Sequence, residues 1–437
     1  GREMLRSRLT YVYVLVCCCL MSAASMGLCF YTSGLFYEAV AEDLGATVGA
    51  VSRTTFIVLG AMAACSLFIS WLLKRVPFKI LIAAGLVLEA GSTLMMAFAF
   101  APGWLYFFGC LQGVGAGLCG MVMIAALLNS WFHDENGWIL SFVFAFGALW
   151  AALMSPAFGF FITNFGWRLS YVIKGTIIAL LLLGPVFIPI DATPARMGLP
   201  AAREKKLQEA KVDGSRIPMV FGQILLLSVL AALLVGIPHH LADYTVSVGL
   251  TLENGASLFT WAMVGNILFK LAAGLLTKKL EPTLTLIGLC IVSAVGLFGM
   301  LLSVSAANLV VLKSLAFLAG SIYGLSELCA PMLIGHYFGK NRYVRLYSLV
   351  NALQLIFMAV AIGCVGYLYD MAHNYIWILI FALLIDGAIG VLLYLLYNGN
   401  QVPDSWKQSA NRIKEAMDEN KSKTKELPYK EVKKLEN

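Results

Sequence analysis

Twelve long apolar stretches constrain this 437-residue chain more than any other feature of its sequence. Each has about the 20 residues that an α-helix needs to cross a hydrocarbon core of about 30 Å. The stretches are continuous rather than alternating, so they predict helices and not the strands of a membrane barrel. They cover residues 9–36, 50–73, 78–101, 104–131, 138–165, 169–190, 219–242, 256–277, 283–305, 309–337, 347–369 and 376–397. An all-α membrane protein with twelve transmembrane helices is therefore predicted.

The composition also favours a lipid environment over a water-soluble fold. Hydrophobic residues make up 60% of the chain and charged residues only 13%, whereas soluble domains carry about 25% charged residues. The net charge of +7 arises mainly in short loops and at the C-terminal end, which argues against nucleic acid as a partner. The ten cysteines lie in apolar stretches without metal-ligand spacing, so we expect no metal and no cofactor.

Lysine and arginine gather in alternate loops between the predicted helices. By the positive-inside rule, this asymmetry places both termini in the cytoplasm. An even number of spans fits termini on the same side. The sequence thus predicts a multi-pass protein of the plasma membrane.

The chain repeats itself at a nearly constant spacing. Lys74-Arg75 follows the second predicted helix, and Lys278-Lys279 follows the eighth, 204 residues later. A fixed offset across six helices indicates two halves related by duplication. The predicted domains are a six-helix bundle over residues 1–190, a central cytoplasmic loop over 191–217, a second six-helix bundle over 218–397 and a charged cytoplasmic tail over 398–437.

Several segments carry a resemblance to a known family. They are Tyr31-Thr32-Ser33-Gly34-Leu35-Phe36, Gln112-Gly113-Val114-Gly115-Ala116-Gly117, Ser155-Pro156-Ala157-Phe158-Gly159, Phe165-Gly166-Trp167-Arg168 and the basic hairpin at residues 70–79. Together with the two-fold repeat, they resemble the major facilitator superfamily, and within it the bacterial oxalate/formate antiporter and monocarboxylate-porter-like branch. The hairpin departs from the family pattern, with Lys74 where Asp is usual. The resemblance covers about residues 9 to 397 and implies a secondary transporter that works by alternating access.

Lys270 is the sharpest candidate for substrate binding. It lies in the middle of the eighth predicted helix, where a charge is costly and therefore a functional candidate. The resemblance implies a substrate-binding cation at this place, four residues before Gly274. The eleventh helix lacks the second cation of the oxalate transporter, so we expect a monocarboxylate rather than a dicarboxylate. Packing against a neighbouring acid is the alternative role. The other expected binding residues are Tyr31, Gln112, Asn266, Tyr323, Asn351 and Gln354.

Glu327 in the tenth predicted helix has two open interpretations. It could be a proton-coupling carboxyl, or it could be a permanent counter-ion of Lys270. Glu89, Lys174 and Asp386 lie in helices that are peripheral in the superfamily, so a role in structural hydrogen bonding is expected for them.

Gating residues are predicted at both ends of the bundle. On the cytoplasmic side, Lys74 and Arg75 face the acidic loop that contains Asp134 and Glu135, and we expect a reversed ion pair there. At the outer end, His239 and His240 could form a gate or a pH sensor, with interfacial packing as the alternative.

The sequence therefore predicts a monomeric secondary transporter of a small organic anion, working by proton symport or anion exchange. No P-loop, zinc-protease or nucleophile-elbow motif is present, so neither ATP-driven transport nor an enzyme is expected. The alternatives are an efflux carrier that exchanges protons for amphipathic compounds and, from another class, a non-transporting membrane sensor or an enzyme.

Overall fold

The computed structural model describes residues 1–132, 137–199, 212, 214–400, 409 and 411–420. The chain forms two compact units, Gly1–Tyr394 and Leu395–Asn437. Twelve helical segments of the described part are long and apolar enough to cross a membrane. The predicted fold class, an all-α protein with twelve transmembrane helices, is confirmed.

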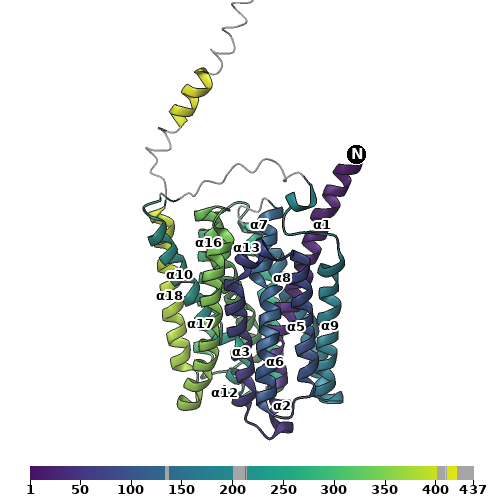
Figure 1. The fold of residues 1–437 in the computed structure, drawn as a ribbon. Coiled ribbons are helices and arrows are strands. Elements are labelled where there is room, and N and C mark those ends of the chain that lie inside the picture. The colour runs from purple at the N-terminus through teal and green to yellow at the C-terminus, as the bar shows by residue number, and fades with distance from the viewer. Residues whose placement is uncertain (133–136, 200–211, 213, 401–408, 410, 421–437) are drawn as a thin grey trace, which may run out of the picture. The chain divides into compact units, whose positions relative to one another are not determined.

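The spanning helices follow one another along the chain, and the longest connection lies between the sixth and the seventh (Figure 1). They are α1 (Arg2–Ser22) with the π-helix η1 (Ala23–Tyr31), α3 (Val48–Leu67), α5 (Phe78–Met96), α6 (Pro102–Leu118) with α7 (Met121–Trp131), α8 (Trp138–Phe165), α9 (Trp167–Phe187), α10 (Ile217–Leu234) with α11 (Gly236–His239), α13 (Leu252–Leu276), α14 (Pro282–Leu302), α15 (Leu309–Ala319) with α16 (Ser321–Phe338), α17 (Tyr343–Ala372) and α18 (Ile376–Gly399). The short elements between them are η2 (Ser33–Phe36), α2 (Tyr37–Leu44), α4 (Ile69–Arg75), η3 (Ala195–Met197) and α12 (Leu241–Ser247). The first predicted stretch ran to Phe36, but the span ends at Tyr31 because the chain turns into η2.

The first, fourth, seventh and tenth spans are each interrupted. The first changes from α-helix to π-helix after Ser22, and the fourth breaks at Cys119 and Gly120. The seventh and tenth break at Val235 and Gly320. Irregular backbone is tolerated at membrane depth only where protein or a cavity surrounds it, and broken helices often line the binding site of a transporter. These four spans are therefore the ones to search for a central site.

Small residues allow the helices of the first half to approach one another. Gly113 and Gly117 of α6 face α3, and a Cβ added at Gly117 would lie 2.7 Å from the Cβ of Cys65. A Cβ added at Gly175 of α9 would lie 2.8 Å from Cγ of Leu94 in α5. Close contact through small residues is the usual way in which membrane helices associate.

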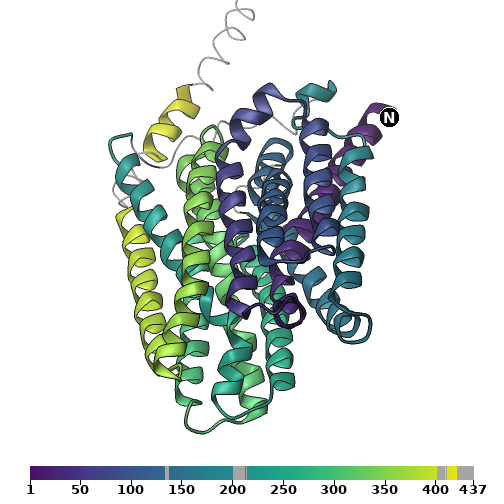
Figure 2. The same cartoon turned by 60° about the horizontal axis from the view of Figure 1, so that its bottom comes forward.

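The first six spans meet the last six mainly along two helix pairs. These are α8 with α13 and α3 with α17 (Figures 1 and 2). At the first pair, Gly274 of α13 lies against Ser141 and Trp138 of α8. The N-terminus lies at one end of this bundle, and α2 and α12 lie at the other end. These two helix pairs flank the region in which the candidate site is found.

Candidate functional site

A buried charged cluster joins the two sets of six spans. Lys270 of α13 forms an ion pair with Glu327 of α16. Tyr31, the last residue of η1, donates a hydrogen bond to the other oxygen of the Glu327 carboxylate. The Lys270 ammonium also donates to the Tyr31 hydroxyl at 3.1 Å and lies 5.6 Å from the centre of its ring. One residue of the first half thus bridges a cation and an anion of the second half.

The cluster is closed off from solvent. Lys270, Glu327 and Tyr31 are 0%, 4% and 4% exposed. Tyr323 packs edge-to-face on Tyr31, with ring centres 5.5 Å apart. Asn266, fully buried one helical turn before Lys270, interacts with Tyr31. Ionised groups so far from water are tolerated only when they are paired and hydrogen-bonded, and each charge of this cluster is paired.

The structure does not bring the other three predicted binding residues into this cluster. Gln112 donates to the Thr93 hydroxyl at 2.7 Å and lines a separate pocket in the first half. Gln354 donates to the carbonyl oxygens of Ser228 and Ser326. Asn351 is buried and lines a small pocket among α3, α6, α7 and α17. The sequence places each of these three residues in a helix. It does not show which neighbouring helix will cover the face on which each residue lies.

The predicted gating residues are placed differently at the two ends. Lys74 and Arg75 are exposed at the end of α4, and the Arg75 guanidinium lies 4.8 Å from the Trp71 ring centre. Asp134 and Glu135 lie outside the described residues, so the reversed ion pair stays a prediction. At the other end, His239 stacks on Phe30 with ring centres 6.1 Å apart.

One contact at the end of α7 was missed by the sequence analysis. The Lys340 ammonium donates to the Phe132 carbonyl oxygen at 2.9 Å, and the Asn129 side chain donates to the Lys340 carbonyl oxygen at 3.4 Å. These bonds join the fourth span to the loop before α17. In the sequence, Lys340 is one more basic residue of a loop, and the backbone atoms that take part in these bonds leave no signal there. His240, by contrast, interacts through Nε2 with the Ile362 carbonyl oxygen at 2.7 Å, within the last six spans.

Two other buried acids have hydrogen-bond partners of their own. Glu89 of α5 accepts hydrogen bonds from the Cys29 thiol at 3.0 Å and the Ser25 hydroxyl at 3.3 Å. Asp386 of α18 accepts one from the Ser293 hydroxyl at 2.6 Å. Among the described residues, no group of three or more His, Cys, Asp or Glu side chains could hold a metal ion. The candidate site is therefore described by the polar ion-pair cluster of Lys270, Glu327 and Tyr31.

The helical fold has counterparts among known membrane transporters. The Major Facilitator Superfamily model matches residues 17–362. The chain belongs to this superfamily. It is accordingly a membrane transporter and not an enzyme, which confirms the broader expectation drawn from the sequence.

The relatives named here share little sequence identity with this superfamily member. The chain is 26% identical over 333 residues to the multidrug resistance protein MdtL of Klebsiella pneumoniae (strain 342), an alignment that covers 70% of this chain and 83% of MdtL. Among solved structures, it is similar to the transporter FucP in the outward conformation, with a TM-score of 0.64 and 14% identity, over 90% of this chain and 100% of FucP. A variant of the E. coli fucose:proton symporter FucP gives a TM-score of 0.63, with the same identity and coverage. At this identity, the likeness to FucP shows the fold alone.

Proposed function

We propose that this superfamily member carries a small monocarboxylate across the plasma membrane, coupled to a proton. The observation that supports the proposal is the buried cluster of Lys270, Glu327 and Tyr31. A buried cation attracts a carboxylate strongly because the low dielectric enlarges the Coulomb interaction. The resemblance of several segments to the oxalate/formate and monocarboxylate-porter-like branch points to the same class of substrate. We place both termini in the cytoplasm, from the distribution of basic residues.

In this proposal, Glu327 occupies the place of the substrate carboxylate when no substrate is bound. Protonation of Glu327 removes its charge and releases the Lys270 ammonium. The carboxylate of the substrate then pairs with Lys270, so the number of charges in the cluster is unchanged. Because a lone buried charge is very costly, proton uptake and anion binding are expected to occur together. In anion exchange, the second mode that the sequence left open, a second carboxylate would replace the first without proton movement.

The cluster also offers a way for the bound anion to act on both halves. Tyr31 belongs to the first six spans, whereas Lys270 and Glu327 belong to the last six. A substrate that displaces Glu327 also changes the hydrogen bond from Tyr31. A substrate that makes different contacts in two arrangements of the halves therefore shifts the equilibrium towards the arrangement that it binds more tightly. Asn266 and Tyr323 complete the proposed site, and a single cation there suits a mono-anion.

Lys270→Ala tests the proposed binding role of the lysine. Purified protein in proteoliposomes is given radiolabelled formate, lactate or pyruvate under an inward proton gradient, with oxalate as the dicarboxylate. We expect saturable uptake of at least one monocarboxylate by the unchanged protein. A hydrogen bond to a charged group contributes about 1.5–3 kcal/mol, so the variant should bind that substrate about tenfold to a hundredfold more weakly.

Lys313→Ala serves as the matched control, since Lys313 is a half-buried lysine of α15 outside the cluster. It should keep the affinity of the unchanged protein. Equal affinity of the Lys270→Ala variant and the unchanged protein for the transported carboxylate would contradict the proposal.

Efflux of amphipathic compounds is the second candidate function, because the relative MdtL is named a multidrug resistance protein. In that case, a cationic dye such as ethidium should be expelled from cells that produce the protein. Glu327 rather than Lys270 would then be the essential member of the pair. Dye efflux that survives in Lys270→Ala and is lost in Glu327→Gln, without carboxylate uptake, would favour this candidate over the first.

A further inference from the structure

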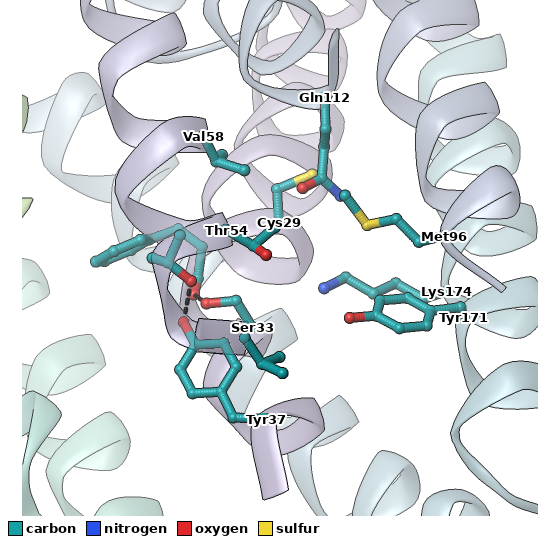
Figure 3. A pocket seen from close by; sticks show the side chains of 12 residues that line it. Cys29, Ser33, Tyr37, Thr54, Val58, Met96, Gln112, Tyr171 and Lys174 are labelled. Atoms are coloured by element: carbon teal, nitrogen blue, oxygen red, sulfur yellow. Dashed lines mark hydrogen bonds between the residues drawn. The ribbon is translucent and has the colours of Figure 1, made fainter. Parts of the chain in front are cut away.

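A second polar pocket lies inside the first six spans, apart from the Lys270 cluster. Its twelve lining residues come from η1, the turn into α2, α3, α5, α6 and α9 (Figure 3). Lys174 and Tyr171 of α9 lie on one side, opposite Thr54 of α3 and Cys29 of η1. Ser33 and Tyr37 line it towards the end of the bundle that carries α2, and both are half-buried. These two side chains are therefore partly exposed near that end of the bundle.

The Lys174 side chain is directed into this pocket. It is only 2% exposed, and its nitrogen points towards the open centre (Figure 3). No hydrogen bond or ion pair joins its ammonium group to any other residue that the structure describes. Its aromatic neighbour is Phe36, whose ring centre lies 5.0 Å away. A cation–π contact of this kind contributes about 0.5–2 kcal/mol, far less than the cost of burying an unpaired ammonium group.

The Thr54 hydroxyl is a second polar group without a partner in the pocket. It is buried, and within the described part of the chain it has no hydrogen-bond partner. Buried polar groups are nearly always hydrogen-bonded, so such a group calls for an explanation. The neighbouring Tyr37 hydroxyl does not supply the missing bond, since it pairs with Thr55. The Lys174 ammonium group and the Thr54 hydroxyl thus face the same space, and neither donates a hydrogen bond to a described residue.

Glu89 does not fill this role. Its carboxylate accepts hydrogen bonds from Cys29 and Ser25, and Glu89 is not among the residues that line the pocket. The Cys29 thiol, which does line the pocket, donates towards Glu89 and away from Lys174. No hydrogen bond or ion pair joins the Glu89 carboxylate to the Lys174 ammonium group, so the ammonium has no direct anionic partner among the described residues.

We propose that this pocket binds a small monovalent anion, of the size of a halide or formate, through Lys174 and Thr54. The anion supplies the negative charge that Lys174 lacks and the acceptor that the Thr54 hydroxyl lacks. Val58 and Met96 line the same pocket, and these apolar side chains restrict its size. The proposal concerns a site separate from the transport cluster, and it stands whether or not the protein carries a monocarboxylate.

Thermal unfolding of the purified full-length protein tests the site. The melting temperature is measured in detergent while sodium chloride, bromide or formate replaces sodium gluconate at constant ionic strength; gluconate is too large for the pocket. We expect saturable stabilisation by the small anions. Lys174→Met should raise the half-saturating concentration at least about tenfold, because it removes a charged hydrogen bond, and Thr54→Val should raise it by less.

Lys313→Met is the matched control and should respond to chloride as the unchanged protein does. Anomalous diffraction from crystals grown in bromide gives a second measurement that needs no variant, with a peak expected beside the Lys174 ammonium. An equal chloride response of Lys174→Met and the unchanged protein, or a bromide crystal without that peak, would overturn the proposal. Because neither measurement involves transport, failure here is distinguishable from failure of the proposed carrier function.

Discussion

Lys270, Glu327 and Tyr31 show how single residues stabilise charge within an apolar bundle. The ammonium is paired with the carboxylate, and the tyrosine hydroxyl bonds to both groups. Removal of one partner from such a pair leaves an uncompensated buried charge, at a cost of about 3–5 kcal/mol, whereas removal of both partners can be nearly neutral. We therefore expect a change of either Lys270 or Glu327 to lower the stability of the folded protein as well as to alter substrate binding.

A double-mutant comparison checks this coupling. Lys270→Met and Glu327→Gln alone should each lower the melting temperature of the purified protein, because each leaves one charge unpaired. The double variant should be more stable than Lys270→Met, since Met and Gln carry no charge. Additive losses in the double variant, measured by thermal unfolding in detergent, would show that the two side chains are not energetically coupled.

At the scale of the helix, close packing of α6 decides where the polar pocket around Lys174 can form. Gly113 and Gly117 bring α6 against α3, and Gly115 brings it against Glu89 of α5. Without these small residues, α6 would stand further from both neighbours. The side chains of Thr54 and Gln112 would then move apart. Both line the polar pocket around Lys174.

Gly113→Ala tests this packing. The added Cβ would lie 2.6 Å from the Cβ of Ala61 and near the Val58 carbonyl oxygen, so a backbone must shift. We expect a loss of about 1–3 kcal/mol, which is typical of overpacking, observed as a lower melting temperature. Gly91→Ala in α5 is the control, since nothing lies within 4 Å of a Cβ added there, and its melting temperature should not fall.

At the scale of the whole helical unit, contacts between the halves lie on both sides of the Lys270 cluster. Towards α2, Phe30 stacks on His239 directly beside Tyr31. Towards the other end, Asn129 and Lys340 join α7 to the loop before α17. If the cluster binds the substrate as proposed, we expect one of these contacts to open before the substrate reaches it. Alternating access in this protein is therefore expected to require that they open in turn.

A reversible cross-link tests the second contact. The background variant carries Cys110→Ala and Cys364→Ala, which remove the two exposed native thiols. Two cysteines are then introduced as Asn129→Cys and Lys340→Cys. A short bifunctional reagent with a cleavable disulfide joins them. We expect uptake into proteoliposomes to stop after cross-linking and to return after reduction. Uptake that continues at full rate in the fully cross-linked protein would show that this contact need not open.

The sequence by itself determined the twelve spans, the assignment to the membrane proteins and the superfamily, because each depends on local information. Twenty apolar residues form a helix in lipid whatever their neighbours. Lys270 and Glu327 were likewise visible as costly charges in apolar stretches. The gate at Lys74, the boundaries of the two bundles, the central loop and the tail, and the branch within the superfamily remain predictions.

Tertiary structure decided which side chains meet. Only the tertiary arrangement brings the Tyr31 side chain of η1 to Lys270 of α13 and Glu327 of α16. The sequence left two roles open for both Lys270 and Glu327. The tertiary arrangement also turns Gln112 into a different pocket and leaves Lys174 facing that pocket, although structural hydrogen bonding was expected for this lysine. Such contacts depend on how far each helix is rotated and how closely it approaches its neighbours. Those quantities are set by the small residues and interruptions of several helices at once, so no single segment of the sequence contains them.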